Sequence, residues 1–322
     1  MSALFRNILA VLIACSAAQA AAQTYPAKAV HVVVPFPPSG AADLLTRALG
    51  NKLGEAWGQA VVTDNRPGAG GNIGAEAVAR SAPDGYTLLM AAVTTHAVSM
   101  SLYSKLGYDL EKDLVPVTLV ANVPHILVAH SSVPGKTLGD VITYLKAQGN
   151  KVNFASQGNG TLSHLEFELM KSMAGFSANH VPYKGSAPAM IDLLAGNVVL
   201  FFDSIPSALP QVRAGKLKGI AVAASRRSPV LPELPTLSEG GLAGFAADNW
   251  FGIMAPAGTP AAIVAKLNAD LTKALDSAEV KEIVARQGGE LMASTPQQMA
   301  AQIRSDREKW GKVVRESGAK IE

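Results

Sequence analysis

Short apolar runs alternate along this chain with segments in which apolar residues recur at helical spacing. Residues 30–34 form a nearly continuous β-branched run, as in a strand that is buried on both faces of a parallel sheet. Residues 42–57 then bring Leu45, Leu49 and Leu53 to one face of a helix. The same reasoning predicts further strands at residues 60–63, 87–93, 115–121, 126–129, 151–155, 178–181, 198–202, 217–223 and 250–255. Because helices fall between most of these strands, we expect an α/β protein with right-handed βαβ units and mostly parallel sheets.

Two extended stretches, residues 118–128 and 249–255, predict the domain organisation. They suit a chain that leaves a first domain, builds a second one and returns. The expected parts are a signal peptide at residues 1–22, a first domain at residues 23–122 and 248–322, and a second domain at residues 123–247.

The part of the chain after residue 256 has a helical pattern. One helix is expected at residues 261–276. Another runs to about Arg315 and opens at Thr295, with Gln298 at the capping-box position. Trp310 lies on the apolar side of this last helix and is expected to anchor it in a core.

The first 22 residues have the features of a secretory signal. Arg6 is their one charge, residues 8–14 are apolar, and small residues follow at the positions that precede cleavage after Ala20 or Ala22. The sequence therefore predicts a periplasmic protein without cysteine in its mature form. Cys15, which follows Leu-Ile-Ala, gives the alternative of a lipoprotein anchored through that residue.

Composition narrows the function classes. A chain of 322 residues with 48% hydrophobic and 16% charged residues suits two folded domains and excludes general disorder. Its 28 Lys and Arg against 25 Asp and Glu, a net charge of +3, do not suit a nucleic-acid binder. The single cysteine leaves no internal disulfide framework and no thiolate metal cluster.

Four loop-to-helix junctions rich in Gly, Ser and Thr carry the chemical signal. The first is residues 37–43, the second residues 156–161, the third residues 94–96 and the fourth residues 184–188. In an open α/β sheet such junctions lie at the carboxyl ends of strands, where ligands bind. Each helix start exposes unpaired N–H groups and a partial positive charge, so it attracts carboxylate or phosphate without an arginine. The alternative is that these residues are the usual turn formers of βα loops and bind no ligand.

Other motifs give no support to a cofactor, metal or hydrolase site. Residues 68–74 lack the spacing of a dinucleotide fingerprint, residues 130–137 lack the first glycine of a phosphate loop, and no Gly-x-Ser-x-Gly occurs. The histidines show no His-Glu-x-x-His spacing. His96 and His164 lie near the junctions, where either a structural or a catalytic role is open. Asp203 suits equally a buried acid facing the cleft or the cap of a following helix.

Several longer motifs occur together and in a fixed order. They are residues 25–26, 34–43, 65–74, 83–88, 156–164, 181–189, 194–196 and 202–203. This pattern, which covers nearly all of the mature chain, resembles the periplasmic solute-binding components of tripartite tricarboxylate transporters, the Bug or TctC-like family.

The resemblance implies a two-domain, type II-like Venus-flytrap fold and a receptor without a cofactor. The receptor captures a small di- or tricarboxylate, acidic amino acid or aromatic acid as a monomer and delivers it to the membrane permease subunits. The ligand-binding residues that it implies are Phe36, Ser39, Gly40 and Asp43 on the first junction, Thr94 and His96 on the third, Gln157, Gly158, Gly160, Thr161 and His164 on the second, and Tyr183, Lys184, Gly185, Ser186 and Asp203. Two alternatives stay open: a sensor that presents its ligand to a membrane signalling protein, and an enzyme with His164 or Asp203 as its base.

Overall fold

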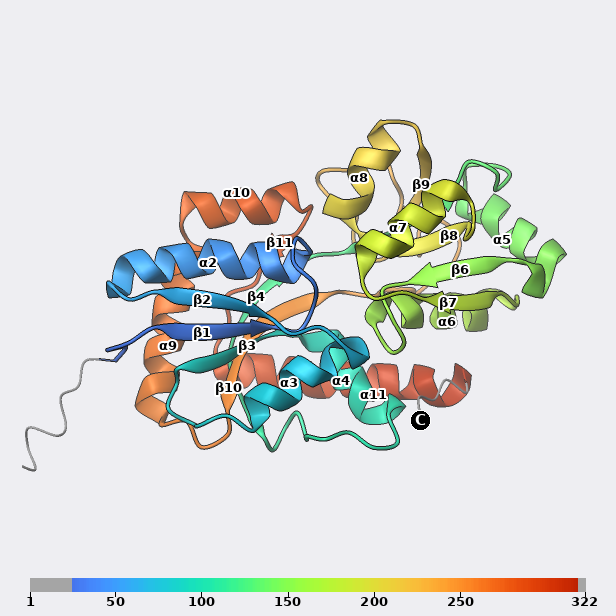
Figure 1. The fold of residues 1–322 in the computed structure, drawn as a ribbon. Helices are drawn as coiled ribbons and strands as arrows, with labels where there is room; N and C mark the ends of the chain where they lie inside the picture. The colour runs from blue at the N-terminus through green and yellow to red at the C-terminus, as the bar shows by residue number, and fades with distance from the viewer. Residues whose placement is uncertain (1–24, 318–322) are drawn as a thin grey trace, which may run out of the picture.

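The computed structural model describes residues 25–317, which form two sheets, each flanked by helices (Figure 1). The first sheet has the order β11-β4-β10-β3-β1-β2. Its strands are β1 (Val30–Val34), β2 (Val61–Asn65), β3 (Thr87–Ala92), β4 (Leu114–Asn122), β10 (Trp250–Pro256) and β11 (Glu290–Leu291). Strand β1 pairs in parallel with β2 and β3, whereas β10 lies antiparallel between β3 and β4.

The second sheet has the order β7-β6-β8-β5-β9. Its strands are β5 (His125–His130), β6 (Asn153–Ser156), β7 (Asn179–Pro182), β8 (Leu200–Ser204) and β9 (Leu217–Val222). Strands β6, β7 and β8 are parallel, and β5 is antiparallel to β8 and β9. Both sheets are therefore mixed. The chain passes from the first sheet to the second at β5 and returns to the first at β10. These two strands lie antiparallel to both of their neighbours.

The helices connect these strands as the periodicity predicts. They are α2 (Ala41–Trp57), α3 (Asn72–Ala79), α4 (Val93–Leu102), α5 (Leu138–Gln148), α6 (Leu162–Ala174), α7 (Ser186–Ala195), α8 (Ile205–Arg213), α9 (Ala261–Leu275), α10 (Ala278–Arg286) and α11 (Pro296–Ser317). The expected capping box is present at the start of α11, where Thr295 and Gln298 exchange backbone-to-side-chain hydrogen bonds. The prediction that residues 94–96 form a loop was wrong, because α4 begins at Val93, directly after β3.

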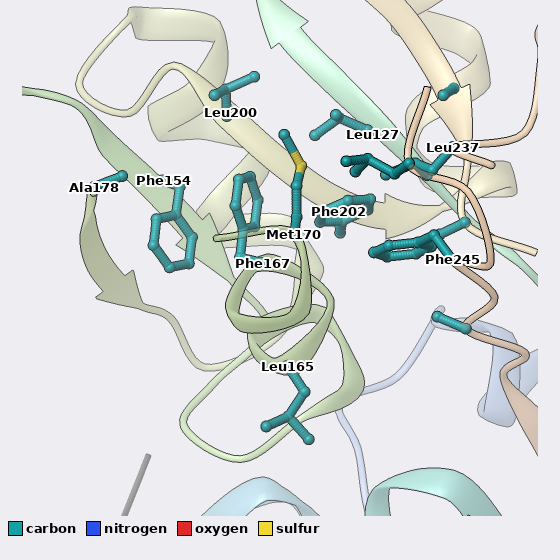
Figure 2. Close-up of a cluster of buried hydrophobic side chains, with 14 of the residues drawn as sticks. Leu127, Phe154, Leu165, Phe167, Met170, Ala178, Leu200, Phe202, Leu237 and Phe245 are labelled. Carbon is teal, nitrogen blue, oxygen red and sulfur yellow. The ribbon is translucent and has the colours of Figure 1, made fainter. Parts of the chain in front are cut away.

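Aromatic side chains fix α6 on the second sheet. The ring centroids of Phe154 and Phe167 lie 4.1 Å apart, and Phe167 meets Phe202 at 4.8 Å. Phe245, from the returning segment, stacks at 6.3 Å from Phe202 (Figure 2). All four rings are almost fully buried, and removal of one such ring from a core costs roughly 3–5 kcal/mol. This packing fixes the start of α6, which carries the second junction.

The last helix joins the two halves of the molecule, and Figure 1 shows it extending from beneath the first sheet towards the second. Met299 and Ile303 belong to a core cluster of the first sheet, whereas Trp310 lies in the same cluster as Phe154 and Phe202 of the second. The predicted role of Trp310 is confirmed, since it is 1% exposed. Helix α11 thus packs on both halves, and the domain limits given above stay a prediction. None of the helices within residues 25–317 is both long and apolar enough to cross a bilayer. The predicted signal segment and Cys15 lie outside the described residues.

Candidate functional site

A cavity of about 320 Å³ lies between the two sheets. Its wall on the side of the first sheet is formed by Phe36, Pro37, Pro38, Ser39, Gly40, Ala41, Ala42, Leu44, Ala92, Thr95, Asn249 and Phe251. Its wall on the side of the second sheet is formed by His125, Gln157, Thr161, Leu162, Lys184, Gly185, Ser186, Ala187, Pro188, Ser204, Pro206 and Ser207. The structure therefore places parts of all four junctions around one space.

The lining has a recurring feature: it contains the N-terminal residues of helices from both halves. Within the described chain, α2, α4, α6, α7 and α8 each contribute residues from their N-cap or first turn. The first N–H groups of a helix have no acceptor within that helix, and the helix dipole makes this end positive. Convergence of these ends makes the cavity attractive to an anion even though no arginine lines it.

The first junction is held in shape by Asp43, which is buried beneath it. Ser39 lines the cavity in a left-handed conformation with φ of 70°, and its N–H donates to Asp43 Oδ2 at 3.0 Å. Arg47 and Asn65 also donate to this carboxylate. Burial raises the pKa of Asp43, but these three partners outweigh burial and hold the pKa below its ordinary value. Phe36, Ser39 and Gly40 thus face the cavity, whereas Asp43 acts behind them.

The second junction follows the same division of roles. Gln157 and Thr161 line the cavity, while Gly158 and Gly160 shape the turn behind them. The Gly158 carbonyl accepts from the Thr161 hydroxyl at 2.8 Å, and the Gly160 N–H points to His164 Nδ1 at 3.3 Å.

His164 does not line the cavity. Its ring stacks on His180 with centroids 3.9 Å apart, and its Nε2 lies 3.6 Å from Glu168 Oε1. Its Nδ1 faces a backbone donor. Both nitrogens therefore have structural partners, which fits the structural role weighed above.

The third junction places a different side chain in the cavity from those predicted. Thr94 and His96 point into the protein interior and are fully buried. Thr94 Oγ1 contacts the Asp248 carbonyl and Asp306, and His96 Nδ1 contacts the Ala92 carbonyl at 2.8 Å. Burial lowers the pKa of His96. Because α4 already begins at Val93, the helix turns Thr95 towards the cavity instead.

Residues of the fourth junction divide again into lining and support. Lys184, Gly185 and Ser186 line the cavity. Tyr183 is directed to Asp192, whose Oδ2 accepts from the Tyr183 hydroxyl at 2.6 Å. Desolvation and this carboxylate raise the pKa of Tyr183 to about 12. Gly185 is the N-cap of α7.

Asp203 is a buried acid at the end of β8, as one interpretation expected, but it does not face the cavity. It is fully buried, does not line the cavity and does not cap α8 from its side chain. It accepts hydrogen bonds from Gln157 Nε2 at 2.8 Å, from Ser186 Oγ at 2.6 Å and from its neighbour's backbone N–H. Burial raises its pKa, and the hydroxyl and amide donors together with His125 oppose that effect.

Sequence reasoning missed the start of α8 and the floor of the cavity. The lining residues at the start of α8 are Ser204, Pro206 and Ser207. The only sequence signal for them is the presence of Ser and Pro directly after β8. Asn249 and His125, which we call the floor of the cavity, also line it. Asn249 Nδ2 donates to the Val123 carbonyl at 3.0 Å and approaches His125 Nε2 at 3.3 Å. His125 Nδ1 faces the buried Glu166 carboxylate at 2.7 Å. His125 therefore presents no free cationic edge to the cavity.

The lining combines polar helix ends with apolar side chains. Lys184, which is exposed, is the one Lys or Arg among the lining residues of the described chain. Phe36, Leu44, Leu162 and Phe251 give the cavity apolar walls for the body of a ligand. His164 and Asp203, the two residues considered as a catalytic base, both lie outside the lining. Within residues 25–317 no group of His, Cys, Asp and Glu is placed to hold a metal ion.

Three comparisons with known proteins agree on one family. Residues 45–319 match the family model described as tripartite tricarboxylate transporter family receptor. The chain is 41% identical over 306 residues to Protein BugT of Bordetella pertussis, which covers 95% of this chain and 94% of that protein. A solved R. palustris protein with adipate shares 36% identity at a TM-score of 0.88, over 92% of this chain and 100% of that chain. MatC from Rhodopseudomonas palustris with bound malate shares 35% identity at a TM-score of 0.84, over 90% and 100% of the two chains.

Proposed function

This chain belongs to the tripartite tricarboxylate transporter receptor family, and from that premise we propose that it is a periplasmic receptor for a small carboxylate. The single observation that carries the proposal is the convergence of five helix starts of the described chain, from both sheets, on one cavity. The adipate and malate in the two similar structures are carboxylates and support the same ligand class. Because an apolar wall lies beside the helix ends, the carboxylate is bound at those ends and the carbon body lies against the apolar wall.

The proposed mechanism is closure of the two halves around the ligand. A ligand that contacts both halves binds the closed form better than the open form, so it shifts the population towards closure. The closed form is then recognised by the membrane permease subunits, which take up the released ligand. The matched family description, which names a transporter receptor, supports this partner.

A thermal-shift screen tests the proposal. Purified protein is scanned with mono-, di- and tricarboxylates, acidic amino acids and aromatic acids, with sugars and nucleotides as controls. A ligand that binds only the folded protein at 100 times its Kd stabilises it by about 2.7 kcal/mol, which raises the melting temperature. We expect a rise with at least one carboxylate and none with the controls. A rise only with sugars or nucleotides would overturn the proposal.

A further inference from the structure

Beneath the second-sheet wall of the cavity lies a chain of hydrogen bonds that ends at Asp203. Ser207 and Ser186 both line the cavity, and their hydroxyl oxygens lie 2.7 Å apart. Ser186 Oγ in turn lies 2.6 Å from Asp203 Oδ2. Asp203 is fully buried, so it acts on the cavity through these side chains and not by contact.

When Asp203 is a carboxylate, donor counting gives the direction of each hydrogen bond in this chain. Gln157 Nε2 and the Ser204 N–H donate to Asp203 Oδ1 and have no lone pair to offer. A carboxylate accepts from all these partners, and in that form Ser186 donates its single proton to Oδ2. Ser186 then has no proton left for Ser207, so the Ser207 proton goes to Ser186 or to the Asp203 carboxylate, which Ser207 also approaches. Both hydroxyl protons therefore point towards Asp203, and these two hydroxyls offer only oxygen lone pairs to the cavity.

This wall also has a second buried acid behind it. Glu166 is fully buried, has one oxygen without a hydrogen-bond partner and pairs through the other with His125 at 2.7 Å. The charge of Asp203 is among the causes that raise the pKa of Glu166, so the two acids act on the same region. The wall formed by α7 and α8 thus offers side-chain acceptors beside its own helix-start N–H groups, and the starts of α2 and α4 lie opposite it.

We propose that Asp203 is a positioning residue that turns Ser186 and Ser207 into hydrogen-bond acceptors, and that the ligand carries a hydroxyl or ammonium donor beside its carboxylate. This inference rests on the proposed carboxylate-binding function and narrows its ligand class. A carboxylate without such a donor leaves the two lone pairs unpaired once water is excluded. The loss of one such hydrogen bond corresponds to a roughly tenfold weaker Kd.

Matched ligands test the inference by titration calorimetry on the full mature chain. The sets are succinate, malate and aspartate; glutarate, 2-hydroxyglutarate and glutamate; and phenylacetate and mandelate. Within the set that binds, the hydroxy or amino acid should bind about tenfold more tightly than the unsubstituted acid. Preference for the hydroxyl or for the amine identifies which donor the wall takes. Equal or tighter binding of the unsubstituted acid overturns the inference but leaves the carboxylate function standing, whereas binding of no acid overturns the function itself.

The variant Asp203→Asn makes the test specific to Asp203. The amide nitrogen that replaces Oδ2 donates to Ser186, so the Ser186 proton is released towards Ser207 or the cavity, and the wall becomes a donor. The preference for the hydroxy or amino acid should fall about tenfold or reverse, with binding of the unsubstituted acid retained. Asp192→Asn on the same half, whose carboxylate accepts from Tyr183 outside the cavity, should keep the wild-type preference.

A folding failure of Asp203→Asn does not remove the test. Ser186→Ala deletes the central acceptor while it leaves Asp203 in place, and it should lose the same preference. If either folded variant keeps the full wild-type ratio of the two affinities, Asp203 does not set this specificity.

Discussion

The backbone N–H of Leu162 donates a hydrogen bond to the hydroxyl oxygen of Thr95 at 3.3 Å, which joins the start of α6 to the first turn of α4. This bond crosses from one half of the molecule to the other beside the cavity. A second bridge, from the Tyr103 hydroxyl to the Asn159 carbonyl at 3.3 Å, lies on the same side. The two halves are thus already in contact around the binding site, as a closed receptor requires.

Substitution of Gly185 tests this contact. A Cβ at residue 185 would lie 3.1 Å from the Cγ of Pro37, across the mouth of the cavity. Gly185→Ala should therefore oppose closure, and we expect the Kd for the best carboxylate to rise about tenfold, as for an overpacked contact costing roughly 1–2 kcal/mol. Calorimetry of the variant measures the change.

The control for this variant is Gly241→Ala. Both glycines have positive φ, 104° and 119°, so alanine is strained at either position. A Cβ at residue 241 meets no atom within 4 Å. Both variants should lose stability, but only Gly185→Ala should lose affinity. Equal affinities for the two variants would show that the Pro37 contact has no part in binding.

Asp43 should support binding without touching the ligand. Asp43→Asn keeps the shape of the side chain but removes the charge that holds Arg47 and the Ser39 N–H. A looser first junction must be ordered when the ligand binds, and we expect a roughly tenfold rise in Kd from this ordering cost. The matched variant Asp140→Asn weakens the cap of α5, far from the lining residues, and should leave the Kd unchanged. Unaltered affinity of Asp43→Asn would exclude the supporting role.

The buried Asp306 gives a pH dependence of stability. Burial raises its pKa from the ordinary value of 3.8 to about 6, against the donors Thr94 and Gln302 and the charge of Lys309. Between these two values the folded protein keeps a proton that the unfolded chain has lost, so stability falls as the pH rises through this range. At 1.36 kcal/mol per pKa unit the loss is about 3 kcal/mol, and it is complete above pH 6.

Asp306→Asn isolates this effect, because its amide mimics the protonated acid and can donate to Thr94. The free energy of unfolding, measured by urea at pH 4 to 8, should fall with pH for the wild type relative to the variant. A difference between wild type and variant that does not change with pH would contradict this assignment.

The local part of this architecture could be predicted from the sequence. The β-branched run of β1 and the Leu45, Leu49 and Leu53 stripe of α2 set those elements by themselves, because their periods match the buried faces. Ser39 and Ser186 were likewise predicted for the site, since each stands at a strand-to-helix turn whose exposed N–H groups follow from local geometry.

The rest depends on contacts between distant residues. Asp203 meets Gln157 and Ser186 across 46 and 17 residues of chain, so its support of the wall is not visible in the sequence. Asn249 reaches the floor of the cavity beside His125, 124 residues away. Thr95 was missed for a local reason: in the first turn of α4, which begins at Val93, Thr95 faces the cavity, whereas Thr94 and His96 are buried in the interior.

The central claim is that the negative charge of a carboxylate is what the converging helix ends recognise. It is tested most directly by calorimetry of the best carboxylate from the screen against its neutral primary amide. We predict one-to-one binding of the acid and about hundredfold weaker binding of the amide, because two charge-assisted hydrogen bonds become neutral ones. Equal affinity for acid and amide, or no binding of any carboxylate, would contradict the account.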